Sequence, residues 1–309
     1  MVYILITPVK NEKRNLPNLA KCIARQTCIP SAWVIVDDNC IDHTPEIIKD
    51  LRDKYDWIYS IKKNETNEYG HLSFATSVKI GYEYAKKICE KNNLHYDYIG
   101  KIDADILLPE NYFQKIIDEF KKDLKYGIIS GSIIHINNIN EIKEKEHSKE
   151  IKDEYILEEF ADERLYRKEF LEEIGGFPIT YSPDTILLIK AKLRGWKIKV
   201  IRNLYFHEVR KFRQKEIWRR TRNIGYGRYF LNYHPFLVLL NAFHTMTEKP
   251  YYHAIAYCYG YIFGMIKRDR KIEDVEIRYY FRYKRWNEIK DKIYSIKKEK
   301  NSWFRVLKR

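Results

Sequence analysis

Several features that would assign this sequence to a familiar class are missing. Its five cysteines are scattered and none belongs to a C-x-x-C pair, which argues against a disulfide framework and a zinc site and favours reduced, cytosolic thiols. No apolar run reaches the roughly 18–20 residues that span a bilayer. No charged leader with a cleavage site precedes the first apolar run, so no signal peptide is expected.

Neither of the common phosphate-binding glycine motifs occurs. The sequence has no G-x-G-x-x-G and no G-x-x-x-x-G-K-[ST], which excludes the dinucleotide turn and the P-loop. A chain of 309 residues that is 45% hydrophobic can form one large α/β domain with an extension. The net charge of +14 points to an anionic partner, which could be a nucleotide, a nucleic acid or acidic lipid headgroups. Most of the excess positive charge lies after about residue 194, and this asymmetry predicts a second functional surface there.

The first hundred residues alternate between short apolar runs and helical patterns. Buried strands are expected at 2–7, 33–36, 58–61 and 98–102, and helices at 16–26, from 44 onward and at 73–91. This alternation predicts a doubly wound, mostly parallel, Rossmann-like sheet with right-handed crossovers.

Two carboxylates follow the fourth of these strands. Asp103 and Asp105 stand one residue apart where the apolar run ends, and Pro109 and Glu110 predict the start of a helix. Ligands bind at the carboxyl edge of such sheets, and Mg²⁺ or Mn²⁺ takes carboxylates together with substrate phosphates. Asp-x-Asp alone is equally explained by a capping or solvated pair.

Three segments together are more specific. Pro8-Val-Lys-Asn-Glu12, Val36-Asp-Asp-Asn-Cys-Ile-Asp-His-Thr44 and Asp103-Ala-Asp105 resemble the inverting family 2 glycosyltransferases of the GT-A fold. Members of that family typically carry a P-x-x-N-E loop, a V-D-D-x-S-x-D-x-T turn and a D-x-D motif in this order. The chain departs from the pattern at Asn39-Cys40, where Gly-Ser is common.

The resemblance implies a role for each acid. Asp38 would bind the nucleobase edge, Asp103 would lie near the ribose, and Asp105 would hold a divalent cation, Mn²⁺ or Mg²⁺. The donor would be a UDP- or GDP-sugar. The nucleotide pocket would be lined further by Pro8, Glu12 and Asp37.

Asp184 is the candidate general base. It stands at the start of an expected helix, where a plain carboxylate would serve as a cap or dipole partner. In the family that the chain resembles, a Gly-Gly-Phe turn precedes an acid pair on such a helix, and the second acid is the base. The match falls on Asp184, with Pro183 in place of the first acid.

A histidine is the second candidate metal ligand. His207 follows a strand expected at 196–201, and in related enzymes a histidine there completes metal coordination or touches the diphosphate. A surface or structural histidine is the simpler interpretation. His71 could line the nucleotide pocket, and 137–153 is either a solvated segment or an acceptor-facing flap.

Beyond residue 209 the composition changes. Arginines and lysines alternate with aromatic residues, and two short apolar stretches follow at 235–240 and 251–266. Such a pattern suits a nucleic-acid surface or helices at a membrane surface, and the apolar stretches favour the membrane. Gly260 and Gly264 would permit a close helix approach, and the tail from 284 would be a peripheral amphipathic helix or a frayed end.

These observations lead to one interpretation of the whole chain. Residues 1–209 are expected to form the GT-A catalytic domain, with a nucleotide-sugar half to about 109 and an acceptor half from 110. Residues 210–309 would be a helical, membrane-associating extension. The protein would transfer one sugar to a hydroxyl of a saccharide acceptor. The acceptor is expected to be lipid-linked, and the enzyme to be peripheral on the cytoplasmic inner face of the cell membrane.

Alternatives remain open. A polyprenyl- or dolichyl-phosphate sugar synthase shares the catalytic domain, and a nucleic-acid-binding protein ranks lowest, because it leaves the ordered acids unexplained. A catalytically dead relative is disfavoured because all the acids are present. The absence of Q-x-x-R-W argues against a processive polymer synthase.

Overall fold

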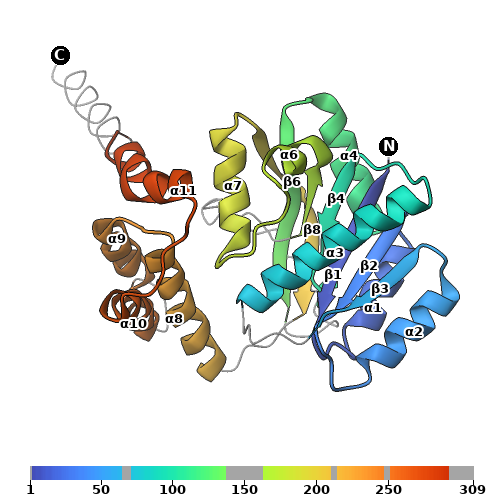
Figure 1. Ribbon diagram of the computed structural model, residues 1–309, viewed down its shortest axis with the longest axis horizontal. Helices are drawn as coiled ribbons and strands as arrows, with labels where there is room; N and C mark the ends of the chain where they lie inside the picture. The colour runs from blue at the N-terminus through green and yellow to red at the C-terminus, as the bar shows by residue number, and fades with distance from the viewer. Residues whose placement is uncertain (1, 65–70, 137–162, 210–213, 247–250, 292–309) are drawn as a thin grey trace, which may run out of the picture. The chain divides into compact units, whose positions relative to one another are not determined.

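A computed structural model describes residues 2–64, 71–136, 163–209, 214–246 and 251–291 (Figure 1). The chain divides into two compact units, Met1–Lys211 and Phe212–Arg309. The proposed acceptor-facing flap at 137–153 lies outside the described residues, as do the last eighteen residues of the basic tail.

The first half of the first unit has the expected alternation. Its elements are β1 (Tyr3–Val9), α1 (Leu16–Ala24), β2 (Ala32–Asp37), α2 (Thr44–Lys54), β3 (Ile58–Lys62), α3 (His71–Lys91) and β4 (Tyr98–Lys101). β1 pairs in parallel with both β2 and β4, and β2 pairs in parallel with β3. All residues of β1 and β2 are buried, as their continuous apolar runs predict.

The second half completes the same sheet. Its elements are β5 (Ile106–Leu107), α4 (Tyr112–Lys122), β6 (Tyr126–Ile136), β7 (Arg164–Arg167), α6 (Lys168–Glu173), α7 (Pro183–Leu193) and β8 (Lys197–Val209). The strand order is β3-β2-β1-β4-β7-β6-β8-β5. β7 runs antiparallel to both β4 and β6, and β5 runs antiparallel to β8. The sheet is therefore mixed, and the predicted α/β architecture is confirmed.

Two expected boundaries were wrong. The helix does not begin at Pro109, because Ile106 and Leu107 form a short strand and α4 starts at Tyr112. The carbonyl of Pro109 instead accepts hydrogen bonds from the Gln26 side chain and the Tyr112 amide. The strand expected to end at 201 continues to Val209 through a register irregularity opposite Ser130 and Ser132, so His207 lies inside β8.

Helices cover both faces of the sheet. One core lies between the strands and α1 and α4, and includes Leu19 and Phe113. The other lies on the opposite face beneath α3, α6 and α7, and includes Tyr82 and Phe170. Gly81 lets α3 approach the sheet closely, because a Cβ there would lie 2.6 Å from Ile6 Cγ2.

The second unit is helical. It contains α8 (Gln214–Phe230), α9 (Pro235–Thr245), α10 (Tyr252–Lys267), α11 (Val275–Tyr279) and a π-helical turn, η3 (Tyr280–Lys284). Gly225 of α8 and Gly260 of α10 each meet the backbone of the other helix, at Tyr257 and Arg222, so the expected close approach through Gly260 is present. Among the described residues, no helix has the length and apolar character to cross a bilayer.

Candidate functional site

The carboxylate of Asp38, just beyond β2, lies in a small buried network. The ammonium of Lys63 lies 3.2 Å from Asp38 Oδ1 and donates to Ser73 Oγ at 2.8 Å and to the Ser73 carbonyl at 2.9 Å. The Ser73 hydroxyl in turn donates to Asp38 Oδ2 at 2.9 Å. Lys63 is only 2% exposed. A buried cation and a hydroxyl therefore hold the Asp38 carboxylate in place at the carboxyl end of β2.

The turn after Asp38 explains how the chain tolerates Asn39-Cys40. Asn39 has φ 56°, the left-handed conformation that asparagine adopts more readily than most side chains. The Cys40 thiol donates to the Val9 carbonyl at 3.4 Å and accepts from the Asn11 amide at 3.2 Å. Burial raises the pKa of Cys40 to about 12. The thiol is therefore a structural hydrogen-bonding group that ties this turn to the end of β1.

Asp37 and Glu12 support the same two loops. Asp37 Oδ1 accepts from the Cys40 amide at 2.8 Å. The Glu12 amide donates to Thr44 Oγ1 at 2.8 Å, and its carboxylate accepts from the Asn15 side chain at 2.7 Å. Pro8 is buried within β1 and lies opposite Val36 of β2. Asp37 therefore ends the strand that leads to Asp38, Pro8 lies in the neighbouring strand, and Glu12 lies in the loop after β1.

His207 belongs to the ladder between β5 and β8, and Asp105 stands in the turn directly before β5. β5 and β8 pair with Leu107 opposite His207, and the Val209 amide donates to the Asp105 carbonyl at 2.9 Å. Asp105 and His207 are therefore diagonal neighbours at the end of this ladder. Both are buried, at 3% and 6% exposure. The described residues contain no group of three or more potential metal-ligating side chains.

A carboxylate and an imidazole at the end of this ladder suit a divalent cation whose other ligands come from a substrate. Mg²⁺ in particular is usually held by one or two carboxylates together with substrate phosphates. Asp105 and His207 are thus a chemically suitable pair for the cation.

Asp184, at the start of α7, lies among buried cations. Its Oδ1 is 3.6 Å from Lys101 Nζ and 3.7 Å from Arg164 Nη1. Lys101 ends β4 and Arg164 begins β7, and the two are register partners. Lys101 also lies 3.8 Å from Asp103 Oδ1, so one ammonium links Asp103 to Asp184.

The charges around Asp184 determine its protonation. Burial acts to raise the pKa of this carboxyl, but Lys101 and Arg164 outweigh burial and hold the pKa below its ordinary value of 3.8. The side chain remains 23% exposed. Asp184 is therefore a charged carboxylate at neutral pH that solvent or a substrate can reach.

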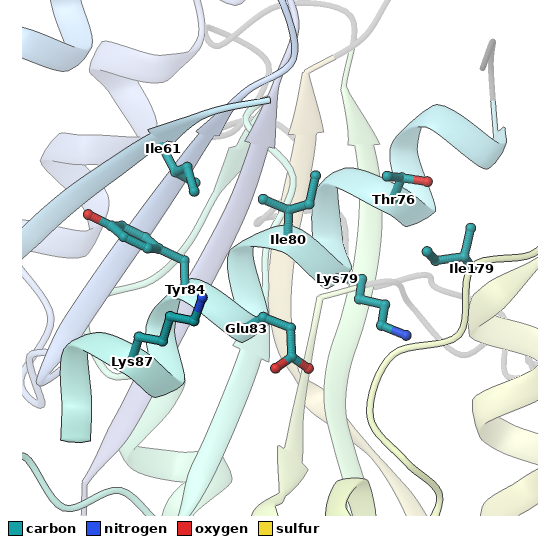
Figure 2. Close-up of a pocket in the computed structure, with 8 residues that line it drawn as sticks. All are labelled: Ile61, Thr76, Lys79, Ile80, Glu83, Tyr84, Lys87 and Ile179. Carbon is teal, nitrogen blue, oxygen red and sulfur yellow. The ribbon is translucent and has the colours of Figure 1, made fainter. Parts of the chain in front are cut away.

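A pocket of about 410 Å³ lies elsewhere, along α3 and the end of β3 (Figure 2). It is lined by Ile61, Thr76, Lys79, Ile80, Glu83, Tyr84, Lys87 and Ile179. None of the acids described above lines this pocket, so it is distinct from the candidate site.

A comparison with models of protein families shows to which family the chain belongs. Residues 4–181 match the model of glycosyl transferase family 2, which is more than half of the sequence. The chain belongs to glycosyl transferase family 2. The matched region contains the segments around Asp38 and Asp105 and ends three residues before Asp184.

Solved structures show the same GT-A fold. The mannosyltransferase PcManGT from Pyrobaculum calidifontis, in complex with GDP-Man and Mn²⁺, is 14% identical with a TM-score of 0.55, and the match covers 85% of this chain and 75% of that one. S. aureus TarS 1-349 in complex with UDP is 15% identical with a TM-score of 0.51, covering 74% of this chain. The chain thus spans 65% of that TarS chain and 45% of the longer TarS chain. No curated protein sequence matches the chain.

The structure adds residues that sequence reasoning missed in this member of glycosyl transferase family 2. Lys63 and Ser73 hold Asp38, and Lys101 and Arg164 hold Asp184. Lys101 had a detectable signal, because it is a charged residue inside a continuous apolar run. Lys63 had none, since the neighbouring Lys62 is exposed and the sequence does not tell the two apart. The side chain of His71 is outside the described residues.

Proposed function

We propose that this glycosyltransferase moves a single sugar, with inversion, from a UDP- or GDP-sugar to a hydroxyl of a saccharide acceptor. The observation that carries the proposal is the Asp184 carboxylate, which is kept charged by Lys101 and Arg164 and remains accessible. An inverting transfer needs one base near the acceptor hydroxyl and a means of offsetting charge on the departing diphosphate. The structurally similar GT-A proteins in complex with UDP and with GDP-Man support a nucleotide-sugar donor.

The proposed step is a single displacement. The Asp184 carboxylate takes the proton of the acceptor hydroxyl while its oxygen forms a bond to the anomeric carbon. The bond from that carbon to the diphosphate oxygen breaks, and the nucleoside diphosphate leaves with the bonding electrons. Asp38 binds the nucleobase of the donor, and Asp103 lies beside its ribose. Pro8, Glu12 and Asp37 line the rest of the nucleotide pocket.

A divalent cation completes the proposal. Asp105 and His207 would hold Mn²⁺ or Mg²⁺, which would offset negative charge on the diphosphate as it leaves. The Mn²⁺ complex of the mannosyltransferase supports the use of a divalent cation. We further propose that the acceptor is lipid-linked, and that the enzyme works peripherally on the cytoplasmic inner face of the cell membrane.

Transfer to a lipid phosphate is the second candidate. The two buried cations beside Asp184 would also suit an anionic acceptor, which needs little help from a base. Transfer that persists in Asp184→Asn would favour this second candidate, whereas loss of transfer would favour a hydroxyl acceptor.

A thermal-shift panel of UDP-, GDP- and other nucleotide sugars, with and without Mn²⁺ or Mg²⁺, tests the proposal. A ligand at about 100 times its Kd adds about 2.7 kcal/mol to the stability of the folded state. For a unit of this size that raises the melting temperature by roughly 5–10 °C.

We expect a metal-dependent shift with one nucleotide, lost in Asp105→Ala and retained in the matched surface variant Asp50→Ala on α2. No shift with any nucleotide sugar, beside a clear shift with oligonucleotides, would refute the proposed function and favour nucleic-acid binding.

A further inference from the structure

The helices α9 and α10 are apolar on both sides. Their inner sides are buried within the second unit through residues such as Leu237, Val238 and Tyr257. Asn241 of α9 donates to the Tyr257 hydroxyl of α10 at 3.3 Å, so the two helices lie in contact. A helix that is apolar all round belongs in a protein interior or in contact with lipid, and these two have only one side in the interior.

The outer sides carry large exposed apolar residues at helical spacing. We call them the α9–α10 apolar face, which consists of Leu239, Phe243, Ile255, Tyr259, Ile262 and Ile266. Phe243, Ile255 and Ile266 are 66%, 61% and 76% exposed. Each helix thus presents a stripe of large apolar side chains to solvent, and exposed apolar patches mark interaction sites.

Charge identifies the kind of partner. The first unit contains 34 Lys and Arg and 34 Asp and Glu, whereas the second contains 23 and 9, so the whole excess of +14 lies in the second unit. α9 and α10 contain no Asp or Glu. Cations instead follow the apolar face at the end of α10, where Lys267 lies 4.7 Å above the Phe263 ring and Arg268 and Arg270 come next.

We infer that the α9–α10 apolar face is a docking surface for a bilayer that contains anionic lipid. Apolar and aromatic side chains would enter the headgroup boundary, and Lys267, Arg268 and Arg270 would pair with lipid phosphates. This inference deepens the membrane part of the proposed function and rests on that function only for the lipid-linked acceptor.

Two other occupants fit the surface less well. A second copy of this chain would bring two units that each carry the +14 excess against one another, which opposes association. A nucleic acid binds through cations placed on the contact face itself, whereas the face here is apolar with cations beside it.

Flotation of the full-length protein with vesicles tests the inference. The vesicles are phosphatidylcholine alone or phosphatidylcholine mixed with phosphatidylglycerol. We expect the protein to float with the mixed vesicles, more weakly with phosphatidylcholine alone, and less at high salt. Phe243→Glu and Ile262→Glu should each lower the partition coefficient about tenfold or more. Leu124→Glu, at an exposed apolar residue of the first unit, is the matched control and should float as the wild type does.

Each remaining outcome has a defined meaning. Failure of the wild-type protein to float with mixed vesicles overturns the inference. Dissociation of a wild-type dimer by Ile262→Glu, without any flotation, makes the occupant a second copy and also overturns it. Unchanged melting temperatures of the variants show that they fold. The nucleotide-dependent thermal shift, measured on the same samples, separates failure of lipid docking from failure of the proposed donor chemistry.

Discussion

Replacing Lys101 by methionine should raise the pKa of Asp184. Methionine keeps the length and apolar stem of the buried side chain but removes the ammonium that lies 3.6 Å from Asp184 Oδ1. Arg164, at 3.7 Å from the same oxygen, remains. The variant therefore isolates one of the two charges that keep this carboxyl ionised.

The size of the effect follows from the distance. An opposite charge within about 4–6 Å lowers a carboxyl pKa by about 1–3 units. Because Lys101 is one of two such charges beside Asp184 and Arg164 stays, its removal should raise the pKa of Asp184 only part of the way back. One unit corresponds to about 1.36 kcal/mol. A depressed carboxyl pKa stabilises the fold above the unfolded-state value and loses that stabilisation as the pH falls through the folded-state value. In Lys101→Met both the acid loss of stability and the acid limb of the pH–rate profile should therefore move to higher pH.

Carboxyl-detected ¹³C NMR titration of aspartate measures this shift directly. Lys115→Met, at an exposed lysine on α4, controls for the loss of one positive charge, and Lys101→Arg should restore a low pKa. An Asp184 titration midpoint that is the same in Lys101→Met and in the wild type would refute the electrostatic account of this site.

Three further substitutions have expected outcomes. Ser73→Ala leaves the Lys63–Asp38 ion pair at 3.2 Å and should lower the free energy of unfolding in urea by about 1 kcal/mol. Asp38→Ala leaves Lys63 buried without its carboxylate, so it should cost about 3–5 kcal/mol and abolish the nucleotide-dependent thermal shift. Gly225→Ala places a methyl group against the Tyr257 carbonyl and should destabilise the second unit by about 1–3 kcal/mol while the nucleotide-dependent shift persists. An Asp38→Ala protein that melts as the wild type does, or a stable Gly225→Ala protein, would contradict the packing described here.

The strands in the first half of the sheet domain could be predicted because buried strands have continuous apolar runs in the sequence. β1 and β2 are buried on both faces, so period and length alone identify them. β5 could not be found this way, since two residues after a turn form a strand only because β8 lies beside them. The continuation of β8 past 201 likewise depends on pairing with β5 and β6.

The site was predictable to a similar extent. The acids at strand ends could be identified from their place after apolar runs and from the family motifs. Their supporting cations could not, because Lys63 and Arg164 are brought to Asp38 and Asp184 by the pairing and packing of distant segments. The roles of Asp184 as general base and of His207 as metal ligand stay predictions, as do the roles of Asp103 and Asp105.

The place of β7 between β4 and β6 has a consequence for the order of folding. Among the described strands, β6 pairs only with β7 and β8, and both follow it in the chain. The strands from β1 to β4 can pair as soon as residue 101 is available, whereas β6 has no place in the sheet until β7 arrives. Pairings between distant segments form late because the loop between them must first close. The network around Asp38 is therefore expected to form earlier than the cluster that joins Lys101, Arg164 and Asp184. The half of the site assigned to the nucleotide-sugar donor should fold before the half that contains the proposed general base.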